Sequence, residues 1–231
     1  NSNTALIFFS RSAEQEGIAK PWLGNGNKKT NTAIARLLIE KAKANIAQSG
    51  LDVFHFDERL QRGANFGSRL ANAFADVFAM GYASAVAVGN DSPELAQLDW
   101  ANVETTLEEG GAVIGPTLRG GAYLIGLQAN AFDAKAFAAL PWQTRDVCQH
   151  LTEYLQASHE KRVDELPVLQ DLNSANDLQS YLQHHQDEVA AGLAQLLFSK
   201  PKQSQPQENQ YAWFTRQAEP LRGPPAEIAR M

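Results

Sequence analysis

The chain has 231 residues, of which 26 are Asp or Glu and 20 are Lys or Arg, so its formal net charge is −6. This acidic balance argues against a dedicated nucleic-acid-binding protein, because neutralisation of phosphates by basic side chains dominates the affinity of such proteins. Hydrophobic residues are 44% and charged residues 20% of the chain, a composition that is typical of folded proteins and excludes a disordered one. The length fits one large domain, or one domain with an appendage.

The compartment is indicated by what the sequence lacks. Cys148 is the single cysteine, so neither an internal disulfide nor a cysteine zinc cluster can form, which suits a reducing compartment. The longest apolar runs, such as 84–89, have the length of a strand and fall far short of the ~20 residues that a membrane span needs. The first residues do not resemble a signal peptide. We therefore expect a cytoplasmic protein that does not bind membranes; a signal removed from a longer precursor is the alternative.

Apolar runs and helical spacing predict alternating strands and helices along the chain. In chain order, the expected elements are a strand over 5–9, a helix over 31–48, a strand over 53–56, a helix over 66–78, a strand over 83–89, a helix over 99–109, strands over 112–115 and 122–127, a helix over 144–158, an edge strand over 162–169 and one long last helix through 178–197. The polar stretch 10–30 reads as a long loop, and loops of that length are usually functional.

This alternation predicts an α/β domain with a mostly parallel sheet over residues 1–198. The strand over 83–89 is very apolar, so we expect it at the centre of the sheet. The remaining residues, 199–231, read as a low-complexity linker followed by an aromatic tail around Tyr211–Phe214. We expect this tail to dock on its own domain or on a neighbouring subunit of a homo-oligomer.

Ligands of open α/β sheets bind beyond the carboxyl ends of the strands, which directs attention to the segments 10–30, 89–94, 116–121 and 171–177. The sharpest signal is Asp91, within Gly-Asn-Asp-Ser-Pro after the most apolar strand. A carboxylate is costly to bury there unless it is paired or binds a metal, and an Asp in this position can hold the Mg²⁺ or Mn²⁺ that neutralises a diphosphate. The alternative is a helix cap or a turn residue.

Five motifs occur in order over most of the chain, from about residue 5 to residue 178. They are G-A-N-F-G-S-R-L, G-N-D-S-P-E-L, G-P-T-L-R-G-G-A-Y-L-I-G-L, P-W-Q-T-R-D-V and L-Q-D-L-N-S-A-N-D-L. Together they resemble a bacterial family of candidate glycosyltransferases, described as radical-SAM/selenodomain-associated transferases and long catalogued as a domain of unknown function. That family is similar to nucleotide-diphospho-sugar transferases of the GT-A fold. The resemblance implies a three-layer, Rossmann-like fold with a mostly parallel mixed sheet, a nucleotide-sugar or nucleotide ligand and a divalent metal.

The resemblance also assigns roles to residues. Asp91 corresponds to the family's metal-binding aspartate, and Asp171, Asn173, Ser174 and Asp177 match its terminal motif. The substrate-binding residues that it implies are Arg11, Lys20, Arg69, Gly120, Gly121 and Trp142. Three positions depart from the family pattern: Arg119 replaces an aspartate, Asn173 replaces a carboxylate and Trp22 replaces an arginine. Asn brings no charge to a hard metal, so these departures weaken the expected site.

Local chemistry offers an alternative for each of these residues. Ser174 and Asp177 have the spacing of a helix cap, and capping is the favoured role of Asp177, whereas a metal or ligand role is open for Asp171. Lys20 and Arg11 are phosphate contacts or solvated loop charges. Arg69 lies in a pocket or on an exposed helix face. The glycine pair at 120–121 admits a ligand or forms a tight turn.

We expect a metal-dependent glycosyltransferase that uses a nucleotide-diphospho-sugar donor and an unidentified small-molecule acceptor entering near 116–121 and Trp142. The alternatives are a nucleotidyltransferase acting on a phosphorylated metabolite and a catalytically silent nucleotide-binding relative. No pattern in the sequence selects a general base, a nucleobase, a sugar, an acceptor or an oligomeric state.

Overall fold

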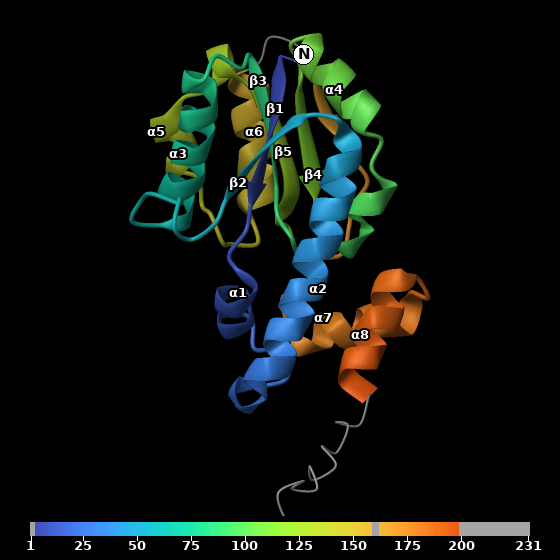
Figure 1. Ribbon diagram of the computed structural model, residues 1–231. Coiled ribbons are helices and arrows are strands. Elements are labelled where there is room, and N and C mark those ends of the chain that lie inside the picture. The colour runs from blue at the N-terminus through green and yellow to red at the C-terminus, as the bar shows by residue number, and fades with distance from the viewer. Residues whose placement is uncertain (1–2, 159–161, 199–231) are drawn as a thin grey trace, which may run out of the picture. The chain divides into compact units, whose positions relative to one another are not determined.

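The computed structural model describes residues 3–158 and 162–198. Figure 1 shows a central sheet with helices on both faces, which confirms the expected three-layer α/β architecture. The strands are β1 (Thr4–Phe9), β2 (Asp52–Phe56), β3 (Ser84–Val88), β4 (Ala112–Pro116), β5 (Ala122–Gln128) and β6 (Val163–Glu165). Their order across the sheet is β2-β1-β3-β5-β4-β6.

The sheet is mixed but mostly parallel, as expected. Strand β1 pairs in parallel with β2 and β3, and β4 pairs in parallel with β6. Strand β5 lies antiparallel between β3 and β4. The carboxyl ends of β1, β3 and β4 therefore meet at one edge of the sheet, where β5 begins. Every residue of β3 is buried, which confirms its predicted central position.

The helices form two layers. They are α1 (Ala13–Ala19), α2 (Lys28–Ile46), α3 (Phe66–Ala79), α4 (Trp100–Glu108), α5 (Ala134–Ala138), α6 (Val147–Ser158), α7 (Ala175–His184) and α8 (Glu188–Phe198), with short 3-10 turns at Asn25–Asn27, Ala47–Ser49, Pro93–Gln97 and Ala129–Ala131. Buried side chains of α3, α5 and α6 pack on one face of the sheet, and those of α2 and α4 pack on the other. A third cluster joins α2 to α7 and α8.

Helix α1 corrects the expectation of a long loop over 10–30. Its sequence is too polar to show an apolar stripe, so tertiary contacts stabilise it instead. The Ser12 hydroxyl accepts a hydrogen bond from the Gln15 amide and caps the helix. Gly17 lets the backbones of α1 and α2 approach closely, because a Cβ there would lie 2.8 Å from the Thr32 nitrogen.

The expected long last helix is also wrong, since the chain turns between α7 and α8. His185 has extended backbone angles, φ −121° and ψ 143°, and ends α7. Asp187 then caps α8 by accepting a hydrogen bond from the Ala190 amide at 2.8 Å. The Tyr181 hydroxyl donates to the same carboxylate at 2.6 Å and fixes the turn. The apolar spacing continues through the break because both helices contribute to the third cluster.

Two smaller differences concern short elements. Helix α5 was not expected, and the predicted edge strand over 162–169 is reduced to the three residues of β6, with Leu169 forming an isolated bridge to Thr117. In the part of the chain that the structure describes, no helix combines the length and the apolarity needed to cross a membrane. The expected linker and aromatic tail, 199–231, lie outside the described residues, so tail docking and assembly through the tail stay predictions.

Candidate functional site

A cleft of about 410 Å³ opens at the carboxyl edge of the sheet. It lies between the ends of β1 and β3, the start of β5, helix α3 and the loop over 141–146. A second cavity of about 330 Å³, which we call the side hollow, extends toward α1. It shares six lining residues with this main cleft: Phe9, Phe66, Asn90, Asp91, Gln143 and Asn173. The segments that the sequence singled out therefore meet at one place.

A chain of alternating charges runs through the side hollow. The Lys20 ammonium forms ion pairs with Asp91 and, at 3.0 Å, with Glu16, whose other oxygen pairs with Arg11 at 3.0 Å. Burial opposes the charge on Lys20, but the two carboxylates outweigh it and hold the Lys20 pKa above its ordinary 10.5. Arg11 and Lys20 both line the side hollow, and their role as phosphate contacts stays a prediction.

Asp91 and Asp171 are held together by the backbone. The Leu172 amide donates to the Asp91 carbonyl oxygen at 2.9 Å, which brings the terminal motif to the end of β3. Burial raises the pKa of the Asp91 carboxyl, although Lys20 acts in the opposite direction. Burial also raises the pKa of Asp171, and the negative charge of Asp91 adds to that effect. Both carboxyls would be stabilised as anions by an added cation.

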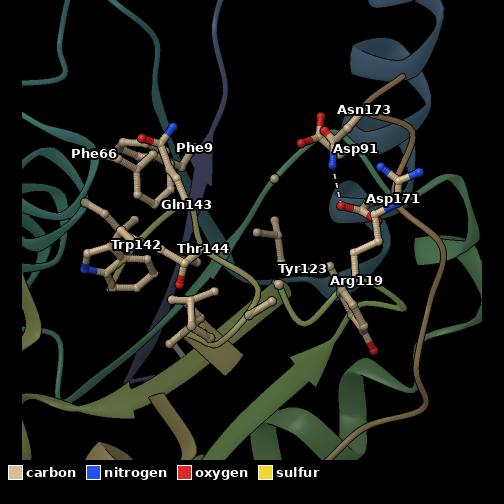
Figure 2. A pocket seen from close by; sticks show the side chains of 18 of the residues that line it. Phe9, Phe66, Asp91, Arg119, Tyr123, Trp142, Gln143, Thr144, Asp171 and Asn173 are labelled. Carbon is tan, nitrogen blue, oxygen red and sulfur yellow. Dashed lines mark hydrogen bonds between the residues drawn. The ribbon is translucent and has the colours of Figure 1, made fainter. Parts of the chain in front are cut away.

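Each departure from the family pattern has a partner in the structure. The Asn173 amide donates to Asp171, and Arg119 forms an ion pair with Asp177 (Figure 2 labels Arg119, Asp171 and Asn173). Asn173 and Arg119 therefore each engage a carboxylate of the site.

Trp22, the third departure, has a structural role. Only 2% of this residue is exposed, and its indole N–H donates to the Leu172 carbonyl oxygen at 3.0 Å. This bond anchors the segment that carries Asp171, across 150 positions of sequence. Trp22 is therefore a buried anchor for this segment.

The predicted cap of α7 is confirmed. The Ser174 hydroxyl accepts a hydrogen bond from the backbone amide of Asp177 at 3.3 Å. The Asp177 carboxylate in turn accepts one from the Ser174 hydroxyl at 2.7 Å and one from the backbone amide of Asn173 at 3.1 Å. With Arg119 added, Asp177 is fully engaged in local contacts, which favours the capping role over a ligand role.

The two glycines of the pair at 120–121 have different roles. Gly120 has φ +79° and forms the tight turn between β4 and β5, where its amide donates to the Thr117 carbonyl oxygen. Its own carbonyl oxygen accepts from the Cys148 amide at 3.0 Å, so the turn is attached to the start of α6. Gly121, but not Gly120, is among the residues that line the main cleft.

Several buried polar atoms around the two cavities have no hydrogen-bond partner within the described ranges. They are Nε of Arg69, Nδ2 of Asn90 and Oγ of Ser92. Buried polar groups are usually satisfied, so such atoms indicate a missing water, ion or ligand. Arg69 lines the side hollow, which supports its predicted pocket position rather than an exposed helix face.

A third, smaller cavity of about 90 Å³ lies between Asp91, Ser92, Thr117 and Asp171. Its size suits a partly hydrated ion, since one water in liquid takes ~30 Å³. The described residues contain no cluster of three or more His, Cys, Asp or Glu side chains arranged for a metal. Two carboxylates and an unsatisfied hydroxyl fit a divalent cation that takes its other ligands from water and from a bound phosphate, which is how Mg²⁺ commonly binds.

Sequence reasoning missed the loop that closes the main cleft. Gln143 has φ +63° and is the only non-glycine residue with a positive φ in the part of the chain that the structure describes. It lines both the main cleft and the side hollow. Strained backbone of this kind concentrates at ligand sites. Trp142 lines the main cleft beside it, as predicted. No signal in the sequence predicts the backbone strain, because it depends on contacts of the folded loop.

The sequence was compared with known families. The profile of the family described as "Uncharacterized protein conserved in bacteria (DUF2064)" matches residues 28–144, which is just over half of the chain. The chain belongs to the DUF2064 family. A search of curated proteins finds no match for it.

Solved structures show what this DUF2064 protein resembles in fold. A protein of Desulfovibrio desulfuricans G20, named as a candidate nucleotide-diphospho-sugar transferase, is 24% identical and has a TM-score of 0.69, with 84% of this chain and 95% of that chain covered. A homologue of Rv0371c from Mycobacterium sp. strain JC1 is 14% identical with a TM-score of 0.47, covering 85% and 99% of the two chains. Rv0371c of Mycobacterium tuberculosis H37Rv, in a complex with manganese, is 12% identical with a TM-score of 0.42, covering 79% and 99%.

The first likeness shows that this DUF2064 protein shares the fold of the Desulfovibrio protein, in agreement with the expected fold. The two mycobacterial likenesses are too weak to support an inference. The residues identified above provide the chemical basis for a function.

Proposed function

We propose that this protein is a glycosyltransferase that transfers a sugar from a nucleotide-diphospho-sugar to a small-molecule acceptor. The observation that carries the proposal is the joint arrangement of Lys20, Asp91 and Asp171 at the carboxyl edge of a sheet with this fold. The two carboxylates provide sites for a cation, and Lys20 with Arg11 provides positive charge for phosphate oxygens.

In this reaction the bond from the anomeric carbon of the sugar to the donor phosphate oxygen breaks, and a bond to an acceptor oxygen forms. The acceptor hydroxyl releases its proton, and a nucleoside diphosphate leaves. We propose that Asp91 and Asp171 hold Mg²⁺ or Mn²⁺ together with the donor. Such a cation, when bound, neutralises the charge that develops on the leaving diphosphate.

The chain's own residues bind and orient the donor. Lys20 would exchange its contact with Asp91 for a phosphate oxygen, while Glu16 keeps its ammonium in place. The free Nδ2 of Asn90 and Nε of Arg69 supply two more donors at the same cavity. Catalysis of this type depends mostly on positioning and electrostatic stabilisation.

Asp91→Asn tests the proposal, because it removes one charge and little volume. We expect titration calorimetry with UDP- and GDP-sugars in Mn²⁺ to show binding of at least one donor to the native chain. Affinity should fall by at least about tenfold in the variant, as is typical when a metal site is perturbed. Asp52→Asn is the control, since Asp52 lies on β2 and its recorded side-chain hydrogen bond is with the Tyr82 hydroxyl.

Absence of heat with every nucleotide sugar, or equal binding by Asp91→Asn, would contradict the proposal. Release of pyrophosphate from a nucleoside triphosphate would instead identify a nucleotidyltransferase. Donor binding without turnover for any acceptor would favour the catalytically silent relative. A cytoplasmic location, proposed from the single cysteine, and an association with radical-SAM or selenium-related proteins remain parts of the same proposal.

A further inference from the structure

The main cleft has two chemically different sides. Figure 2 shows Asp91, Asp171 and Asn173 on one side, and Phe66 and Trp142, with Gln143 and Thr144 beside them, on the other. The proposed donor residues account for the charged side. They leave the aromatic side without an assigned ligand.

The aromatic side is a continuous wall. Phe9 packs edge-on against Phe66 with ring centroids 5.6 Å apart, and Phe66 packs against Trp142 at 5.4 Å. The indole N–H of Trp142 already donates to the Phe137 carbonyl oxygen at 2.8 Å. With this donor used, the wall offers ring carbon atoms to a ligand.

The floor beneath this wall is apolar as well. By floor we mean Leu70, Ile125 and Val147, three apolar residues that also line the main cleft and are 3%, 4% and 5% exposed, respectively. A sugar bound against this floor would leave hydroxyl groups without hydrogen-bond partners, and each such loss is costly. A flat apolar ring would lose no hydrogen bonds there and would gain aromatic contacts.

The donor's phosphates are expected elsewhere. Arg11, Lys20 and Glu16 line the side hollow and are not among the residues that line the main cleft. Phe9, Phe66 and Gln143 line both cavities, whereas Trp142 lines the main cleft alone of the two, and Gln143 carries the strained backbone. Its amide is therefore placed between a ligand on the phosphate side and a ligand on the aromatic side.

We propose that the aromatic side of the main cleft, formed by Phe9, Phe66 and Trp142, is the acceptor subsite and that its ligand presents an apolar ring to this wall. The assignment of this site to the acceptor rests on the proposed function. The binding of an apolar ring at this wall can be measured without any nucleotide.

The experiment uses the full chain, with 2-naphthol as the ring probe and D-glucose as the sugar probe, and measures both by titration calorimetry. We expect 2-naphthol to bind and D-glucose to give no heat. Phe66→Leu should weaken 2-naphthol binding about three- to tenfold, the range expected from the loss of an aromatic contact. Phe54→Leu is the matched control, because Phe54 is also a partly buried ring with an edge-on partner, Tyr82, but is not part of the cleft lining.

A second variant, Ala122→Phe, adds a large side chain to the lining of the main cleft and replaces none of the three wall residues. It should abolish 2-naphthol binding while thermal melting shows a folded chain. Equal binding of 2-naphthol by the native chain, Phe66→Leu and Ala122→Phe would overturn the proposal, and so would binding of D-glucose without 2-naphthol or no binding of either probe.

The last arm separates an acceptor from a nucleobase. Binding of 2-naphthol should persist when the protein is saturated with whichever nucleotide it binds. Displacement by that nucleotide would place the base against Phe66 and overturn the acceptor assignment while supporting the proposed function. If no nucleotide binds but 2-naphthol binds as expected, the proposed function fails and the ring site stands.

Discussion

Gln143 shows how a single residue can be strained at a site of ligand contact. A left-handed backbone costs a non-glycine residue about 1–2 kcal/mol, and the fold must supply this energy from other contacts. The neighbouring Trp142 anchors the loop through its bond to Phe137, and the Thr144 hydroxyl donates to the Pro141 carbonyl oxygen at 2.7 Å. The amide of Gln143 is thereby held at the boundary of two cavities.

Gln143→Gly and Gln143→Ala separate the backbone from the side chain. Both variants remove the amide group, but only glycine adopts the positive φ without strain. We expect the free energy of unfolding to be higher for the Gly variant than for the Ala variant by about 0.5–1 kcal/mol, because relief of strain exceeds the extra entropy of unfolded glycine. Urea unfolding measures the difference.

Ligand binding provides the other half of this prediction. Both variants should bind a nucleotide sugar more weakly than the native chain and to a similar degree. A higher free energy of unfolding for the Ala variant than for the Gly variant would show that the left-handed geometry is not strained. Unchanged binding in both variants would show that the amide does not contact a ligand.

At the scale of elements, helix α3 depends on a glycine where it meets the cleft. A Cβ on Gly67 would lie 2.3 Å from Cδ1 of Trp142 and 2.5 Å from the Ala138 carbonyl oxygen. These distances are far below van der Waals contact, and the carbonyl belongs to a backbone that cannot rotate away. The first motif of the sequence, G-A-N-F-G-S-R-L, therefore brings α3 close enough to hold the tryptophan in the wall.

Gly67→Ala should lower the free energy of unfolding by about 1–3 kcal/mol through overpacking, against the usual helix preference for alanine. Gly192→Ala in α8 is the matched control. A Cβ there would meet the flexible end of Leu37 at 3.0 Å, so we expect a change of less than about 1 kcal/mol in either direction. Thermal or urea unfolding of both variants decides the point. Equal effects at the two positions would contradict a specific contact with Trp142.

The helices and strands also show what local apolar patterns in the sequence can and cannot predict. Apolar patterns predicted α2, α3 and the strands along the chain, because these elements bury regular apolar faces. The patterns missed α1, whose buried Glu16 is stabilised by Lys20 and Arg11 rather than by apolar contacts. They joined α7 and α8 because the turn between them is made by Asp187 and Tyr181, which apolar spacing does not register.

At the scale of the whole molecule, residues Asn1–Phe198 form a compact unit of their own. Removal of residues 199–231 should therefore leave the melting temperature within about 2 °C of the full chain. Light scattering on both chains tests the predicted role of the aromatic tail in assembly. We expect the particle in solution to have a mass greater than that of one chain only when the tail is present. The same mass for both chains, or a large loss of stability on truncation, would contradict this division.

The sequence by itself determined the α/β architecture and the edge at which chemistry is placed. Strand length, helical spacing and the position of Asp91 after the most apolar strand are local properties, and parallel strands necessarily bring their carboxyl ends to one edge. Of the candidate substrate-binding residues, Arg11, Lys20, Arg69, Gly121 and Trp142 line the two cavities and Gly120 lines neither, while their binding roles stay predictions.

Only the tertiary structure decided which partners these residues take. The bond from Trp22 to Leu172 spans 150 positions, and the pairing of Lys20 with Asp91 or of Arg119 with Asp177 joins segments that no local spacing relates. The aromatic wall and the left-handed backbone of Gln143 arise in the same way. Long-range packing sets these contacts, and their energies depend on neighbours that are distant in sequence.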